Sequence, residues 1–354
     1  MSTYIYFSKN MVINRDFTIS SLKALCIIFM VIGHSGSPDG LGNFIYLFHM
    51  PCFFFCSGFL FKDEYLSNVK VFISKRVKGL WLPFVKWSFI FLLFHNLFAN
   101  IGIYNTKLVW GGELLKQIID ILIMIDSEQL LGGFWFLKQL LYASIISFFT
   151  LKFIDYFKLK QNLFLPCFIV VYLILAFIFS ISSVRIPTIS STTMLASAYF
   201  LFGYSYKKYD FKRNNLFFGL LCLFLLFVVS LFFTGSMFVI GWDVFVYFFV
   251  SILGCVGLLN IVFYIKNDRV RRVLDYIGAK TLYILIWHFL SFKLVSLFII
   301  IVYDLSITRL SDFPVISMPY YWILYSIVGI IVPLVIWELV NRISDIFEGN
   351  WLSR

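Results

Sequence analysis

The stretch that decides the fold runs from Arg15 to Gly36 and reads RDFTISSLKALCIIFMVIGHSG. It predicts an apolar membrane helix with a lysine near one end and a histidine at the other. Lys23 and His34 are about 20° past three full helical turns from each other and roughly 16 Å apart along the axis, so they share one face. Together they could hold the two ends of a long, thin ligand, because ionisable groups in membrane helices are functional candidates by default. The alternative is that Lys23 reaches for the membrane interface and His34 simply ends the helix.

Apolar residues dominate the whole chain. Of its 354 residues, 61% are hydrophobic and 13% are charged, and the mean hydropathy is +0.92. The apolar runs are long enough to span a bilayer, so we expect an all-α polytopic membrane helix bundle and exclude a water-soluble globule. About ten spans, in a single transmembrane domain over residues 1–354, are expected. Their approximate ranges are 17–35, 44–61, 80–100, 133–151, 163–182, 191–206, 215–233, 239–264, 281–303 and 320–341.

The net charge of +11 is distributed unevenly among the loops. Most of the 29 Lys and Arg residues fall in alternate loops, whereas the intervening loops hold only Lys107, Lys116, Arg185 and Arg309. Because cytoplasmic loops collect Lys and Arg, this pattern places the basic loops and both termini in the cytoplasm. The charge therefore gives no reason to infer nucleic acid as a partner.

Other features predict packing. The six cysteines lie in apolar runs without metal-type spacing, so we interpret them as core residues and expect neither disulfides nor a metal site. The long external loop, 101–132, contains apolar residues at helical spacing and predicts a short interfacial helix. Ser57-Gly58 in the second span and the small residues of the sixth, TTMLASAYFLFGYSY, predict close approach between helices.

Four histidines are the main candidates for chemistry. His34 and His49 are expected at the external ends of the first two spans, where a helical hairpin brings them close. His288 falls roughly 12 Å into the ninth span, where an imidazole without a partner is costly. His95 is interpreted as an interfacial residue. Because an imidazole can take and return a proton near neutral pH, His34 and His49 are the catalytic candidates.

A basic cluster precedes the third expected span. The segment SKRVKGLWLPF carries Lys75, Arg76 and Lys78, which could bind phosphates by charge and by the forked guanidinium. Anionic lipid or simple membrane orientation would explain the cluster equally well. Motifs for nucleotide hydrolysis, dinucleotide binding, zinc proteolysis and serine hydrolysis do not occur.

The pattern Lys23-x10-His34 resembles the (R/K)-x10-H signature in the first helices of acyltransferase family 3, the multi-span enzymes that modify bacterial surface glycans and other exported acceptors. Matching segments follow in order from about residue 15 to 290: FHMPCFFFCSGFLF, SKRVKGLWLPF, GGFWFLKQLL, YFLFGY and IGAKTLYILIWHF. Two positions depart from the family pattern. Ser20-Ser21 stands where an Asp often precedes the Leu-Lys pair, and Gly79 stands where a further Arg is common.

The resemblance implies a membrane-embedded, acyl-CoA-dependent O-acyltransferase, most simply an O-acetyltransferase, in the bacterial cytoplasmic membrane. Its donor would be acetyl-CoA from the cytoplasmic side, and its acceptor a hydroxyl of a surface polysaccharide or lipid-linked glycan. Lys75, Arg76 and Lys78 would bind the CoA phosphates, and the pantetheine arm would run along the face from Lys23 to His34. Beside these residues we expect His49 to orient His34, and Trp135 and His288 to line or support the cavity.

Two other functions fit the residues without the resemblance. A lipid-linked sugar flippase or transporter would use the same buried charges as a substrate path, and a glycan polymerase is also a polytopic enzyme. Transfer of label from acetyl-CoA to a glycan distinguishes the acyltransferase from both.

Overall fold

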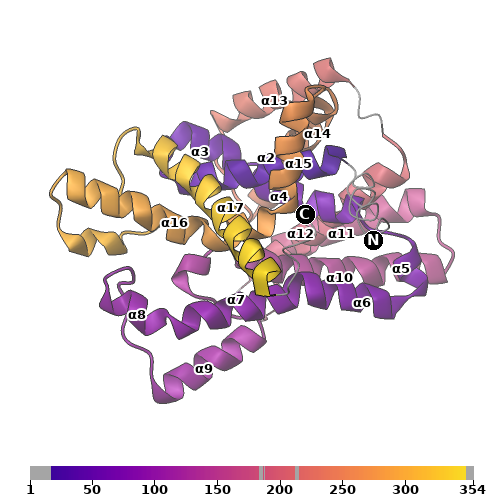
Figure 1. Cartoon of the computed structure of the whole chain (residues 1–354). Coiled ribbons are helices and arrows are strands. Elements are labelled where there is room, and N and C mark those ends of the chain that lie inside the picture. The colour runs from indigo at the N-terminus through magenta and orange to yellow at the C-terminus, as the bar shows by residue number, and fades with distance from the viewer. Residues whose placement is uncertain (1–16, 183–185, 187, 212–214, 348–354) are drawn as a thin grey trace.

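The computed structural model describes residues 17–182, 186, 188–211 and 215–347, and within these residues all regular secondary structure is helical (Figure 1). The all-α prediction is therefore confirmed. Arg185, which the charge pattern places outside, lies beyond the described residues, as do the two chain ends, which it places in the cytoplasm.

The α-helices, in chain order, are α2 (Phe17–His34), α3 (Asp39–Tyr46), α4 (His49–Phe59), α5 (Glu64–Ser67), α6 (Val69–Arg76), α7 (Leu82–Leu93), α8 (His95–Asn100), α9 (Gly111–Leu122), α10 (Trp135–Tyr156), α11 (Gln161–Ile181), α12 (Ser191–Lys208), α13 (Leu216–Ser230), α14 (Asp243–Phe263), α15 (Asp268–Ala279), α16 (Thr281–Val302) and α17 (Tyr321–Phe347). A π-helical turn, η1 (Val77–Trp81), joins α6 to α7. Two 3₁₀ turns, η2 (Gln129–Leu131) and η3 (Ile307–Ser311), lie in loops.

Seven helical stretches among the described residues are long and apolar enough to cross a membrane. They are Phe17–His34, Asp39–Phe59, Trp135–Tyr156, Gln161–Ile181, Asp243–Phe263, Thr281–Val302 and Tyr321–Ile343. A multi-span helical membrane protein is thus confirmed. The count of ten and the side on which the termini lie stay predictions, because α13 has only 15 residues and the third expected span is not continuous.

The third expected span, 80–100, breaks after Leu93. His95 Nε2 bonds the carbonyl oxygen of Lys107, and the Asn96 side chain exchanges two hydrogen bonds with the backbone of Val109. These bonds hold the following loop against α8, so the apolar run does not continue as one helix. The helix expected within 101–132 is confirmed as α9, whereas the expected loop between the eighth and ninth spans contains the helix α15.

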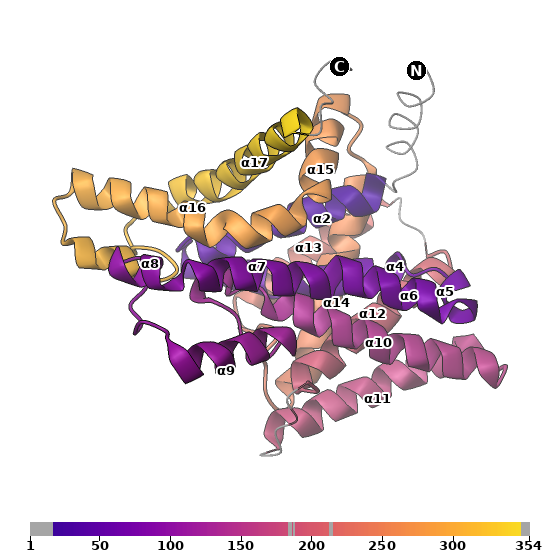
Figure 2. The same ribbon diagram turned by 60° about the horizontal axis from the view of Figure 1, so that its bottom comes forward.

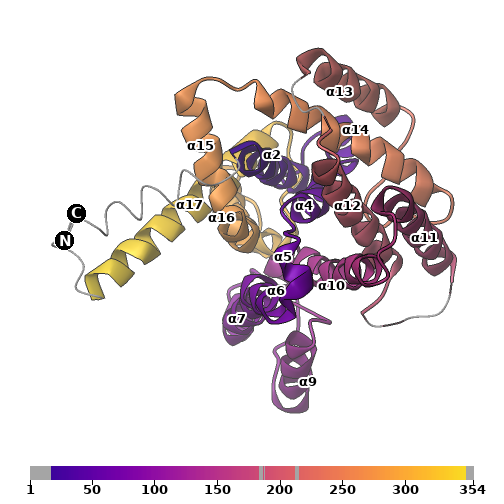
Figure 3. The same cartoon turned by 90° about the vertical axis from the view of Figure 1, so that its right-hand side faces the viewer.

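Helix α2 lies at the centre of the bundle. It packs against α3, α4, α14, α15, α16 and α17, and Figure 3 shows α4, α14, α15 and α16 arranged around it. At Gly278 of α15, an added Cβ would lie 2.1 Å from the backbone oxygen of Ser20. This glycine therefore lets α15 approach the start of α2 and fixes the helix that carries Lys23 and His34.

Helices α4 and α12 meet through glycine on both sides. A Cβ at Gly58 would lie 1.8 Å from the carbonyl oxygen of Phe200, and a Cβ at Gly203 would lie 2.1 Å from that of Phe55. Close packing of small residues is the usual way in which membrane helices associate without a hydrophobic driving force. Close helix packing was expected separately at Ser57-Gly58 and at the sixth span, and the structure shows that these two helices are each other's partners.

Figure 2 shows how the ends of the bundle are occupied. Helix α6, which carries Lys75 and Arg76 of the basic cluster, lies with α5 at one end, and α8 lies at the other. The connection between α16 and α17 is at the same end as α8. This arrangement separates the basic cluster from the segments that the charge pattern assigns to the outside.

We expect Gly203→Ala to destabilise the protein by about 1–3 kcal/mol, because the new methyl group would overlap the backbone of α4. The thermal unfolding midpoint in nanodiscs, followed by intrinsic fluorescence, measures the loss. Gly40→Ala is the matched control, because a Cβ at Gly40 of α3 has no neighbour within 4 Å. Equal midpoints for the two variants would contradict this account of the α4–α12 contact.

Candidate functional site

Two neighbouring cavities lie along α2. The histidine cavity, of about 250 Å³, is lined by Met30, His34, Tyr46, His49, Met50, Gly133, Trp135, Ser236, Met237, Phe238, Tyr247 and Leu285. The lysine cavity, of about 270 Å³, is lined by Lys23, Ile27, Met30, Met50, Phe53, Cys56, Ser57, Leu60, Gly79, Leu80, Phe136, Leu137, Leu140, Thr281, Leu282 and Leu285. Met30, Met50 and Leu285 line both cavities and form the wall between them. Lys23 and His34 thus face two adjoining spaces, consistent with their shared helix face.

His34 is hydrogen-bonded to His288. Nδ1 of His34 lies 3.1 Å from Nε2 of His288, and the two rings stack with their centroids 5.3 Å apart. Phe289 stacks on His34 from a centroid distance of 5.0 Å. His288 is completely buried in α16, so the structure supplies the partner that an imidazole at this depth requires.

The hydrogen bonds around His288 decide which nitrogen of His34 is basic. Nδ1 of His288 lies 3.1 Å from the carbonyl oxygen of Ile284 and 3.0 Å from that of Leu285. A carbonyl oxygen can only accept, so the proton of a neutral His288 is on Nδ1 and its Nε2 is an acceptor. His34 then donates its Nδ1–H to His288, which leaves the lone pair of His34 on Nε2. His288 therefore holds His34 in the tautomer of a base or nucleophile.

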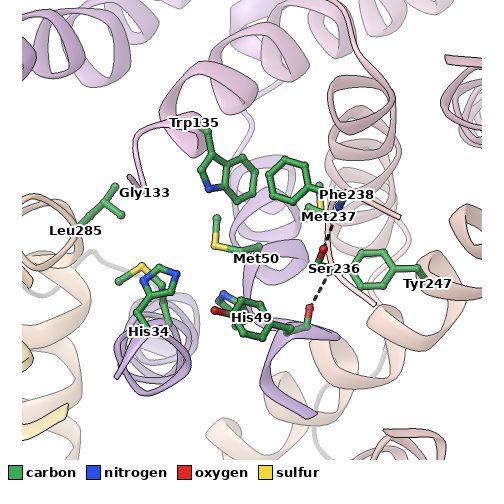
Figure 4. Close-up of a pocket in the computed structure, with 12 residues that line it drawn as sticks. His34, His49, Met50, Gly133, Trp135, Ser236, Met237, Phe238, Tyr247 and Leu285 are labelled. Carbon is green, nitrogen blue, oxygen red and sulfur yellow. Dashed lines mark hydrogen bonds between the residues drawn. The ribbon is translucent and has the colours of Figure 1, made fainter. Parts of the chain in front are cut away.

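His49 is the first residue of α4, and its proton is on the same ring nitrogen as that of His34. Its Nδ1 lies 2.8 Å from the carbonyl oxygen of Ile45, so the neutral ring again carries its lone pair on Nε2. Figure 4 shows the His34 and His49 rings on the same side of the cavity, with Trp135 across from them. We expected His49 to orient His34. In the described structure the side-chain hydrogen bond to His34 Nδ1 comes from His288, and the His49 ring donates to the backbone of α3.

A break between α3 and α4 positions His49. Leu47 and Phe48 lie between the two helices. Two side chains of α14 donate hydrogen bonds to backbone carbonyl oxygens next to this break. Tyr247 Oη donates to the carbonyl oxygen of Tyr46 at 2.9 Å, and Ser251 Oγ donates to that of Leu47 at 2.6 Å. Sequence reasoning missed Tyr247 and Ser251. Their spacing of one helical turn, inside an otherwise apolar span, is the signal that could have found them.

Trp135 lines the histidine cavity at the first residue of α10. Its ring packs against Phe238, with the centroids 5.0 Å apart. The preceding Gly133 allows α10 to start close to α16, because a Cβ there would lie 2.6 Å from Leu285. The backbone before α10 thus places the indole opposite the two histidines.

The basic cluster lies next to the lysine cavity but does not line it. The Lys75 ammonium donates to the Tyr65 hydroxyl at 2.9 Å, and this hydrogen bond raises the pKa of Lys75. The Arg76 guanidinium lies 5.2 Å from the centroid of Phe72, and burial lowers the pKa of Arg76 to about 10, so it stays charged at neutral pH. Lys78 is exposed, and its chain neighbour Gly79 lines the cavity.

These features define a multi-span membrane protein with two internal cavities, one lined by a hydrogen-bonded histidine and the other by a lysine. The family model for the acyltransferase domain of acyltransferase family 3 matches residues 17–338. The chain therefore belongs to acyltransferase family 3 and is a membrane acyltransferase. No curated protein and no solved structure matches the chain.

We expect His288→Leu to reduce acyl transfer by about 10²-fold, because His34 would lose the acceptor that sets its tautomer. His288→Gln is the matched variant, since its side-chain oxygen can accept from His34 Nδ1, and it should recover part of the turnover. Turnover and the unfolding midpoint would be measured together. If His288 positions His34, His288→Leu lowers kcat while its unfolding midpoint stays near that of His288→Gln. Equal turnover of the two variants would contradict the role.

Proposed function

We propose that this membrane acyltransferase is an acyl-CoA-dependent O-acyltransferase that transfers an acetyl group to a hydroxyl of a surface polysaccharide or lipid-linked glycan. The observation that carries the proposal is the bond between the buried His288 and His34, which lines the histidine cavity next to the lysine cavity. Family membership supplies the reaction class, which is acyl transfer. The acetyl-CoA donor and the glycan acceptor are the parts that we add by proposal.

The proposed chemistry uses the lone pair on His34 Nε2. In direct transfer, this nitrogen accepts the proton of the acceptor hydroxyl as the oxygen attacks the thioester carbonyl carbon. The C–S bond then breaks, and the proton passes from His34 to the leaving CoA thiolate. In the second version, Nε2 attacks the thioester carbonyl carbon and the C–S bond breaks to release the CoA thiolate. The acceptor oxygen then attacks the acyl group on Nε2, the N–C bond breaks, and the hydroxyl proton passes to the thiolate. Both versions require the tautomer that His288 sets.

The donor would follow the two cavities. Lys75, Arg76 and Lys78 supply positive charge for the CoA phosphates beside the lysine cavity, and Lys23 lies in the wall along which the pantetheine arm would pass. Side chains that stay positively charged at neutral pH can bind the CoA phosphates, and the guanidinium of Arg76 can form two parallel hydrogen bonds to one of them. The thioester would then cross the wall of Met30, Met50 and Leu285 to reach His34.

The acceptor would enter from the other end of the bundle. The charge pattern assigns the end with the basic cluster to the cytoplasm and the end with α8 to the outside. Donor and acceptor would therefore meet inside the membrane from opposite faces. This arrangement fits an enzyme whose donor is made inside the cell and whose product is displayed outside it.

We expect His34→Ala to abolish transfer, because general base catalysis contributes about 10²–10⁴-fold. The assay follows label from radioactive acetyl-CoA into base-labile esters of a glycan-containing membrane extract, with the purified protein in nanodiscs. Lys23→Ala should also lose activity, and Lys23→Arg should keep part of it if charge is what matters. Near-full turnover by His34→Ala would remove His34 from the mechanism, and equal activity of Lys23→Ala and Lys23→Arg would favour the interfacial role of Lys23.

We expect joint substitution of Lys75, Arg76 and Lys78 by Ala to raise the KM for acetyl-CoA with little change in kcat, because uniform binding energy appears mainly in KM. Lys266, Arg269 and Arg272, which are also exposed and are expected on the same side, provide the matched triple control. In oriented vesicles, acetyl-CoA should sustain transfer only from the face that carries these residues. Turnover sustained only from the opposite face would disprove the cross-membrane geometry without touching the family assignment.

A further inference from the structure

A third pocket lies in the segments around α8, α9 and η2. This loop pocket has a volume of about 140 Å³, and its lining includes His95, Tyr104, Gln117, Asp126, Glu128 and Gln129. Figure 2 shows α8 and α9 at the end of the bundle opposite α5 and α6. Most of the residues that line it carry polar side chains.

Two sets of hydrogen bonds hold the pocket in shape. His95 Nδ1 lies 2.9 Å from Glu128 Oε2, and both side chains are only 7% exposed. The other nitrogen of His95 donates to the carbonyl oxygen of Lys107 at 3.1 Å. Asn96 and Val109 are joined by two further bonds. The loop after α8 is therefore tied to the segment before α10, and the pocket does not depend on a loose loop.

Two amide oxygens of the pocket residues, Gln117 Oε1 and Gln129 Oε1, are buried without a hydrogen-bond partner in the described structure. The Tyr104 hydroxyl is also buried, beside the Glu128 carboxylate with which it interacts. A buried polar atom without a partner costs about 1–3 kcal/mol, so two around one small pocket require a reason. A ligand with its own donors and acceptors would satisfy them.

The chemistry of the walls selects the class of ligand. Burial and the neighbouring Glu128 carboxylate raise the pKa of Tyr104, so its hydroxyl is a donor at neutral pH. The amide oxygens of Gln117 and Gln129 accept, and the carboxylates of Asp126 and Glu128 disfavour an anion. Among the described residues, no group of three or more His, Cys, Asp or Glu side chains could hold a metal ion. A neutral ligand with several hydroxyl groups fits these walls best.

The loop pocket is connected to the histidine cavity by one short segment. Glu128 and Gln129 line the loop pocket, and Gly133 and Trp135 line the histidine cavity. Between them, a Cβ at Gly132 would lie 3.4 Å from Phe289, the ring that stacks on His34. Four residues of backbone span at most about 14 Å, so a molecule in the loop pocket lies within reach of the cavity of His34.

We propose that the loop pocket binds a sugar ring of the acceptor glycan and so selects which glycan presents its hydroxyl to His34. This inference rests on the proposed function, because it names the subsite for the acceptor of that reaction. Tyr104, Gln117 and Gln129 would bond the ring hydroxyls, and His95 and Glu128 would hold the walls in place. A purely structural role does not account for the two unsatisfied amide oxygens of Gln117 and Gln129.

The test measures sugar binding without catalysis. The unfolding midpoint of the protein in nanodiscs is followed with methyl glycosides of glucose, galactose, mannose, rhamnose and N-acetylglucosamine, and with mannitol as a control for general osmolyte stabilisation. At least one glycoside should raise the midpoint above the mannitol value, because a ligand stabilises the state that binds it. Tyr104→Phe and Gln117→Leu should each weaken the apparent affinity by about 3- to 10-fold, the value of one hydrogen bond.

Tyr104→Phe removes the hydroxyl beside Glu128 and leaves the ring in place. Its midpoint without sugar is measured first, so that a cost to the fold is separated from a loss of the sugar-dependent shift. Tyr320→Phe, at a residue that is 82% exposed and outside the pocket, is the matched control. The proposal is overturned if no glycoside exceeds mannitol in the native protein, or if both pocket variants keep the full shift.

Acetyl-CoA separates the failure of this inference from that of the proposed function. If acetyl-CoA protects the protein and donates its acetyl group while no glycoside binds, the loop pocket is not the acceptor subsite and the O-acyltransferase stands. If a glycoside binds through Tyr104 while acetyl-CoA neither protects nor reacts, the sugar pocket stands and the donor assignment is wrong.

Discussion

An imidazole inside a bundle of apolar helices needs a hydrogen-bond partner, and this requirement organises the centre of the molecule. His34 ends α2 and His288 lies in the middle of α16, so the bond between them joins the first span to a helix 254 residues later in the chain. The carbonyl oxygens of Ile284 and Leu285 fix the proton on the far side of His288. The backbone of α16, and not a carboxylate, therefore decides which nitrogen of each histidine donates and which accepts.

The backbone contacts of small residues make this centre possible. Gly278 brings α15 against the start of α2, and Gly58 and Gly203 bring α4 and α12 together. At each contact an added Cβ would overlap a backbone oxygen, so a larger residue there would push the helices apart. The side chains that line the cavities are thus carried on helices whose spacing depends on these glycines, and the proposed transfer needs such fixed positions.

Much of the fold and part of the site could be predicted from the sequence. Hydropathy identified the helical membrane class, helical spacing placed Lys23 and His34 on one face, and small residues indicated where helices would touch. The His34–His288 bond could not be derived in this way, since it depends on how α16 is rotated against α2. The roles of Tyr247 and Ser251 were also hidden, because they act on a break between α3 and α4 that apolar periodicity does not reveal. The end of the third expected span depended on side-chain bonds from His95 and Asn96 to a later loop, which composition does not encode.

The wall shared by the two cavities has an electrical consequence. An enzyme that receives one substrate from each side of a membrane, as proposed above, must not conduct ions between the two sides. Met30, Met50 and Leu285, which line both cavities, are all apolar. Apolar constrictions close to ions by excluding water, whereas unbranched methionine side chains can move aside for a slender organic chain. In the proposed reaction, these residues would let the donor arm pass while keeping the two compartments electrically insulated from each other.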